Sequence, residues 1–100
     1  MTATDILHRV SKARGVPVKR ILEKNKKASV TRARQEAIYL IRRHTKLSSP
    51  EVGRILRRDH STVLHDEAVV GFLAMENEDY AAELEAIVTP MTFAMALFRS

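Results

Sequence analysis

Two helix-start signals lie close together in the middle of the chain, and they constrain its fold more than any other feature. The first is Ser48-Ser49-Pro50-Glu51, in which a capping serine precedes a proline and a glutamate. The second is Asp59, an acidic cap that precedes a new apolar run. The helix between them has room for only about two turns, so Arg57-Arg58 must form the turn that follows it. Two helices joined in this way have the layout of a helix-turn-helix.

The rest of the chain also has a helical pattern, because apolar residues recur at intervals of three and four and β-branched alternation is absent. Thr4 is expected to cap a first helix that ends at Gly15. Further helices are expected from Pro17 to about Glu23, from Val30 to about His44, and from Asp59 to about Ala74. The expected core side of the last of these is Val63, Leu64, Ala68, Val69, Phe72 and Leu73. We therefore predict an all-α fold, a small helical bundle that contains a helix-turn-helix.

The chain divides into two expected parts. Residues 1–75 form the helix-turn-helix domain, and residues 76–100 form an extension that is acidic first and apolar afterwards. Pro90 interrupts the helical pattern of the extension, and Met91 to Phe98 could form a last helix. Two alternatives stay open for this end: it folds back on the core, or residues 80–100 bind a protein partner or a second copy.

The formal net charge is +5, and its distribution indicates the kind of partner. Of the 17 Lys and Arg residues only Arg99 lies beyond Asp66, whereas half of the 12 acidic residues do. A basic N-terminal two-thirds is typical of a protein that binds a polyanion. Because aromatic residues for stacking bases are few, we expect double-stranded DNA rather than single-stranded nucleic acid.

Enzymatic sites are not indicated. Asp59-His60-Ser61 contains the residue types of a hydrolase triad, but neighbours on a helix point about 100° apart and cannot form a relay. His60 and His65 stand five residues apart, whereas metal-binding pairs on a helix usually stand four apart. The three glycines are isolated, so no phosphate-binding loop is present. We expect no catalytic residue, no metal, no cofactor and no small-molecule substrate.

Membrane association is not expected either. No apolar stretch is long enough to cross a bilayer, and the basic residues are spread over several helices and loops. The absence of cysteine suits a reducing cytoplasm. We expect a cytoplasmic, nucleoid-associated protein.

Three segments of the sequence resemble one known family. They are Val30-Thr31-Arg32-Ala33-Arg34-Gln35, Ser49-Pro50-Glu51-Val52-Gly53 and Arg58-Asp59-His60-Ser61-Thr62-Val63-Leu64-His65. In this order and approximate spacing they resemble the C-terminal DNA-binding domain of the bacterial replication initiator DnaA. The resemblance covers about residues 4–72. It implies an all-helical, Trp-repressor-like domain that reads an asymmetric, A/T-rich box in the major groove.

The resemblance also implies roles for individual residues. Lys26 takes the position of an arginine that the family places in the minor groove, and Arg34-Gln35 that of a pair that touches the DNA backbone. Together with the outward polar positions, the expected base contacts are Asp59, His60, Ser61, Thr62, Pro50 and His65. The expected contacts to the backbone or the minor groove are Lys26, Lys27, Arg32, Arg34, Gln35, Arg42, Arg57 and Arg58. For the lysines and arginines the alternative is a solvated loop or helix face.

Four departures from the family suggest an altered site preference. Lys26 replaces arginine, and Ser61 replaces the first of two threonines. Arg57-Arg58 stands where the family usually has two glycines before its arginine. Asp66 replaces a small residue that can approach bases, and its charge is expected to repel phosphates.

We predict sequence-specific binding of double-stranded DNA, with transcriptional regulation in a bacterium or bacteriophage as the first role. The alternatives are a replication accessory that competes for initiator boxes, and an adaptor that recruits a protein through residues 76–100. Nothing in the chain resembles an ATPase.

Overall fold

The computed structural model describes residues 1–89, which form six helices and no strand. Their bounds are α1 Ala3–Arg14, α2 Val18–Leu22, α3 Ala28–His44, α4 Ser49–Leu56, α5 His60–Glu76 and α6 Glu78–Val88. The prediction of an all-α fold with a helix-turn-helix is confirmed for these residues. The last helix expected from Met91 to Phe98 lies outside the described residues.

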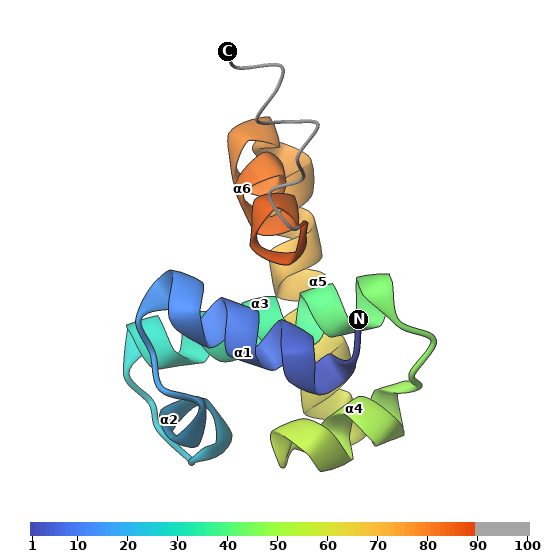
Figure 1. The fold of residues 1–100 in the computed structure, drawn as a ribbon. Helices are drawn as coiled ribbons and strands as arrows, with labels where there is room; N and C mark the ends of the chain where they lie inside the picture. Colours follow the sequence, from blue (N-terminus) through green and yellow to red (C-terminus); the bar gives the residue numbers. More distant parts are fainter. Residues whose placement is uncertain (90–100) are drawn as a thin grey trace.

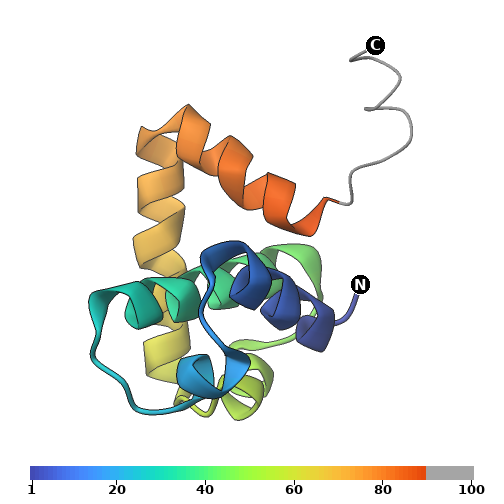
Figure 2. The same cartoon turned by 60° about the vertical axis from the view of Figure 1, so that its left-hand side comes forward.

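The helices are arranged around α3, which packs against both α1 and α5 (Figure 1). α2, α4 and the first turns of α5 lie together at one end of the molecule. α6 leaves the other end of α5 and crosses over α1 and α3 (Figure 2). The helix-turn-helix and α6 are therefore at opposite ends.

The hydrophobic core is centred on α3 because this helix is apolar on a wide stripe. Ala37, Ile38, Leu40 and Ile41 are completely buried. Fully burying one such aliphatic side chain contributes about 1.5–3 kcal/mol. Leu84 and Val88 of α6 join the same core, so the described part of the range 80–100 folds back on the body. The rest of that range, and with it the expected partner surface at residues 90–100, lies outside the described residues.

Two helix starts differ from the sequence expectation. Thr2 rather than Thr4 caps α1: the Asp5 backbone N–H donates to Thr2 Oγ1 at 3.1 Å, and the Thr2 N–H donates to Asp5 Oδ2 at 3.0 Å. This reciprocal pair satisfies two free N–H groups, which Thr4 could not do from inside the helix. α3 begins at Ala28 instead of Val30. The predicted stop at Gly15 is confirmed by its left-handed φ of 66°.

The predicted core side of α5 is confirmed at Val63 and wrong at Leu64, Ala68 and Phe72. Leu64 is 45% exposed and Phe72 is 61% exposed, and Ala68 is also exposed. The buried line of α5 is instead Val63, Asp66, Val70 and Ala74. α5 has apolar residues on two adjacent faces, so periodicity could not select the face that meets α3.

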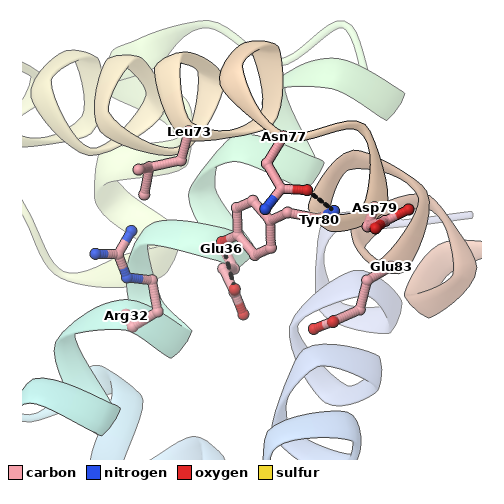
Figure 3. A pocket seen from close by; sticks show the side chains of 7 residues that line it. All are labelled: Arg32, Glu36, Leu73, Asn77, Asp79, Tyr80 and Glu83. Carbon is pink, nitrogen blue, oxygen red and sulfur yellow. Dashed lines mark hydrogen bonds between the residues drawn. The ribbon is translucent and has the colours of Figure 1, made fainter.

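The acidic α6 is held to the body by arginines. Arg14 of α1 donates from Nε to Glu36 Oε1 at 2.7 Å and from Nη2 to Glu36 Oε2 at 3.0 Å. The Tyr80 hydroxyl of α6 donates to the same buried carboxylate at 2.5 Å (Figure 3). Glu83 and Glu85 pair with Arg14 and Arg43. Part of the acidic charge beyond Asp66 therefore fastens α6 to α1 and α3.

Candidate nucleic-acid interface

The first helix of the pair begins at a serine cap. The Ser48 side chain accepts from the Glu51 backbone N–H at 3.3 Å and donates to Glu51 Oε1 at 2.9 Å. Ser48 is thus the N-cap of α4, with Pro50 in the first turn. Pro50 is exposed.

The turn closes tightly on α4. Arg57 is the C-cap in the left-handed conformation, with φ 58°, and it is the only residue other than glycine with a positive φ in residues 1–89. The Arg58 backbone N–H then donates to the Gly53 carbonyl oxygen at 2.8 Å. A β-carbon on Gly53 would lie 2.4 Å from the Arg58 carbonyl oxygen. The glycine that this helix-turn-helix requires is thus one turn earlier than the connecting residues.

Asp59 is the N-cap of α5, and its Oδ1 accepts from the Thr62 backbone N–H at 2.8 Å. This hydrogen bond holds the pKa of Asp59 below its ordinary value, because it favours the carboxylate form. His60, Ser61 and His65 are exposed, and Thr62 is half-buried. The first turns of α5 therefore present polar side chains outward, anchored from beneath by the buried Val63.

Arg58 points inward. Its Nη2 donates to the Glu23 carbonyl oxygen at 2.7 Å, and its Nη1 lies within hydrogen-bond distance of the carbonyl oxygens of Leu22, Leu56 and Arg57. Burial lowers its pKa. Arg58 thereby fastens the end of α2 to the turn before α5, and so sets where the lysine-containing loop stands beside the recognition helix.

That loop joins α2 to α3, and its lysines face solvent. Lys26 and Lys27 are exposed. The Lys27 backbone N–H donates to Asn25 Oδ1 at 2.8 Å, which shapes the loop as an Asx turn. Arg57 and Arg54 are also exposed at the turn and on α4. One end of the molecule therefore combines exposed cations with the polar start of α5.

The long helix contributes less exposed charge than expected. Arg34 Nε donates to Asp66 Oδ2 at 2.9 Å, and Gln35 Nε2 donates to Asp66 Oδ1 at 3.2 Å. The Asp66 side chain is 1% exposed. Asp66 was expected to repel phosphates as a free charge. Instead α5 turns this carboxylate toward α3, where two donors satisfy it.

Comparison with known proteins identifies the family. The family model described as the bacterial dnaA protein helix-turn-helix matches residues 3–70. This chain belongs to that family. The resemblance on its quoted motifs is thereby confirmed.

Several DnaA proteins are similar to the chain, and each bears the name chromosomal replication initiator protein DnaA. The one from Bacteroides fragilis (strain YCH46) is 33% identical over 90 residues, which are 89% of this chain and 19% of that protein. The one from Streptococcus uberis is 37% identical over 84 residues, 83% of this chain and 19% of that protein. The one from Desulfotalea psychrophila is 35% identical over 72 residues, 72% of this chain and 15% of that protein. The chain thus spans less than one fifth of these relatives, and the first match extends past Glu76 into α6.

The two remaining arginines of the expected set lie elsewhere on this DnaA-type domain. Arg42 donates from Nε to Glu67 at 3.2 Å and from Nη1 to the Leu47 carbonyl oxygen at 2.9 Å, so it braces α3 against α5 and the loop before α4. Arg32 is exposed beside Leu73 and Tyr80, in a hollow between α3, α5 and α6 (Figure 3). Both remain expectations as DNA contacts.

The residues expected to contact DNA did not include Arg54, an exposed cation of α4. The inner face of α4 is formed by Val52, Ile55 and Leu56, and the same periodicity predicts an outward Arg54. Among residues 1–89 no group of three or more His, Cys, Asp and Glu side chains could hold a metal ion. In the same residues no helix combines the length and the apolar character that a membrane span requires.

Proposed function

We propose that the protein binds double-stranded DNA sequence-specifically through the start of α5. The observation that carries this proposal is the meeting of two features at one end of the molecule. The polar side chains of His60, Ser61 and His65 stand exposed at the start of α5. The exposed cations of the neighbouring loop and turn lie at the same end. Membership of a helix-turn-helix family supports the same use.

The polar residues at the start of α5 and the surrounding cations have different roles. The start of α5 enters the major groove, where His60, Ser61 and Thr62 meet base edges, and Asp59 caps the helix first and contacts bases second. Pro50 lines the groove from α4. Lys26, Lys27, Arg54 and Arg57 hold phosphates or the minor groove, which supplies affinity that depends on salt but little specificity.

Replication-related binding is the first role that we propose. The similar proteins named above are replication initiators, which favours sites related to initiator boxes over the transcriptional role predicted from the sequence. Transcriptional regulation is the second candidate. Lys26 and Ser61 depart from the family pattern, and these departures support a site that differs from the initiator's own box. In either role the protein acts at the nucleoid.

Selection of bound sites from random duplex DNA at a stated salt concentration tests the proposal. The full chain should enrich one asymmetric, A/T-rich motif. A variant with His60→Ala and Ser61→Ala keeps every described cation and serves as the matched control, because it should bind duplex DNA without enriching that motif. Failure of the full chain to enrich any motif would contradict the proposal. Enrichment of an initiator-type box would favour the replication role, and a distinct motif would favour regulation.

A further inference from the structure

One buried carboxylate joins the recognition helix to the start of α3. Asp66 of α5 uses both oxygens: Oδ2 accepts from Arg34 Nε at 2.9 Å and Oδ1 accepts from Gln35 Nε2 at 3.2 Å. Its side chain is 1% exposed, so neither oxygen is available to solvent as a free charge. The carboxylate is thus fully committed to two neighbouring residues of α3.

The contact holds Arg34 by one edge only. An arginine side chain has five N–H donors, and here Nε alone donates to Asp66. In residues 1–89 the terminal nitrogens Nη1 and Nη2 of Arg34 have no hydrogen-bond partner, yet no buried side-chain nitrogen there is left unsatisfied. The two terminal nitrogens therefore reach solvent. The base of the guanidinium is fixed, and its far end keeps contact with solvent on a side chain that is 14% exposed.

Arg34 lies in α3 soon after the loop that carries Lys26 and Lys27. Burial lowers the pKa of Arg58, the residue before the cap of α5, and the positive charge of Arg34 lowers it further. Asp66 itself is about 10 Å along the helix axis from the cap Asp59. The pair thus joins α3, which follows the lysine-containing loop, to α5.

We propose that Asp66 is a positioning residue for DNA binding, which grips Arg34 at Nε and presents its two terminal nitrogens to a DNA phosphate. This inference rests on the proposed function. A guanidinium held in a fixed plane loses less rotamer freedom when it meets a phosphate, so the contact forms only in one register. The negative charge of Asp66 also offsets the long-range attraction of Arg34. Asp66 therefore helps to orient the protein on the duplex and reduces its non-specific electrostatic attraction to DNA.

The opposite role would follow if Asp66 only repelled phosphates. Its removal would then strengthen binding to every duplex alike. The neighbouring Glu67 offers a matched control, because it is also acidic, lies on the same helix and pairs with an arginine of α3, Arg42. Glu67→Gln removes one negative charge and frees Arg42 without touching Arg34, so it separates the loss of an acidic charge from the loss of the Arg34 contact.

The test is a double-mutant cycle in the full chain with Asp66→Asn, Arg34→Gln and both together. Binding is measured on the duplex that wild type selects and on a scrambled duplex, at two salt concentrations, alongside thermal unfolding. Asp66→Asn should lose about tenfold on the selected duplex, the size of one hydrogen bond to a charged group, and little on the scrambled one, where the oriented contact does not form. The double variant should bind no more weakly than Arg34→Gln alone. Glu67→Gln should keep the preference of wild type.

Three results would overturn the proposal. Equal tightening on both duplexes by Asp66→Asn and Glu67→Gln would show that Asp66 only repels, and additive losses in the cycle would show that the two residues act independently. If Asp66→Asn does not fold, Arg34→Lys takes its place: it keeps the charge but has no Nε edge, so wild-type affinity in this variant would also overturn the proposal. If the wild-type protein binds the selected and the scrambled duplex equally well, the proposed function is contradicted too. If it prefers the selected duplex but the losses are additive, only the role of Asp66 is contradicted.

Discussion

Gly53 and Arg58 meet backbone to backbone at the turn of the helix-turn-helix. The Arg58 N–H donates to the Gly53 carbonyl oxygen at 2.8 Å, and a β-carbon on Gly53 would stand 2.4 Å from the Arg58 carbonyl oxygen. Real β-carbons do not approach backbone oxygens so closely, and neither partner is a flexible side-chain end. The direction in which α5 leaves the turn therefore requires a residue without a β-carbon at position 53.

Gly53→Ala should destabilise the protein by about 1–3 kcal/mol, because the turn must shift to admit the methyl group. Gly71→Ala is the matched control: its β-carbon would meet only the Tyr39 ring at 3.6 Å, an ordinary contact. Since alanine is favoured over glycine inside a helix, this control should be neutral or stabilising by up to about 1 kcal/mol. Chemical denaturation of the two variants measures both effects. Equal stability of the two would show that the turn tolerates a side chain at position 53.

Arg57→Gly should raise stability and weaken DNA binding together. Arg57 has φ 58°, a left-handed conformation that costs a residue with a β-carbon roughly 1 kcal/mol. We propose that its exposed charge holds a phosphate, so its loss should lower the salt slope of binding by about one. Arg54→Ala serves as the comparison, because it removes a nearby exposed charge from a helical position. It should weaken binding without the gain in stability, and a similar gain in both variants would argue against strain at Arg57.

Tyr80→Phe should loosen α6 without changing DNA binding. The variant removes a hydrogen bond to the buried Glu36 carboxylate, which we expect to cost about 1–2 kcal/mol of unfolding free energy. Tyr39→Phe is the control, since the Tyr39 hydroxyl has no hydrogen-bond partner in the part of the chain that the structure describes. DNA affinity should stay the same in both, because α6 lies at the end of the molecule opposite α2 and α4.

Alkaline titration gives a second test of the same contact. Burial, together with the hydrogen bond to Glu36, raises the pKa of Tyr80 above its ordinary value of 10.0. A raised pKa means that the folded protein holds this proton more tightly, so the stabilisation is complete below pH 10 and is lost as the pH rises above it. Tyr80→Phe should lack this part of the alkaline loss. If wild type and Tyr80→Phe lose stability in parallel above pH 10, the contact does not contribute.

Lys26→Ala should weaken binding to all duplexes alike and lower the salt slope by about one, as expected for a contact with phosphates. Lys26→Arg should instead strengthen binding at A/T-rich sites, because a narrow minor groove favours arginine. Equilibrium binding over a range of salt concentrations distinguishes the two variants from wild type. An unchanged slope in Lys26→Ala would identify the segment as a solvated linker.

Local signals in the sequence predicted helix boundaries well where a capping residue acts on backbone groups close to it in the sequence. Ser48 and Asp59 start helices, and Gly15 ends one, because each acts on backbone groups within a few residues. The face that α5 buries was predicted wrongly, since Leu64 and Val70 are equally apolar and only contact with α3 distinguishes them.

Local sequence patterns could not predict the contacts between residues that are far apart in the sequence. Arg34 and Asp66 are 32 residues apart in the sequence, and Arg58 reaches Glu23 across 35. Nothing near either arginine indicates that its side chain is engaged inside the protein. The exposed positions at the start of α5 were easier to predict from the sequence, because the buried Val63 determines which of its neighbours point outward.

Replacement of Thr62 by alanine tests the central claim most directly. Thr62 Oγ1 and its methyl group stand in the first turn of α5. The hydrogen bond from the Thr62 backbone N–H to Asp59 Oδ1 does not depend on the side chain, so Thr62→Ala keeps this capping contact. Affinity should fall by roughly 1–3 kcal/mol on the duplex that wild type selects and change little on a scrambled duplex. Equal losses on the two duplexes would contradict the claim that the start of α5 reads bases.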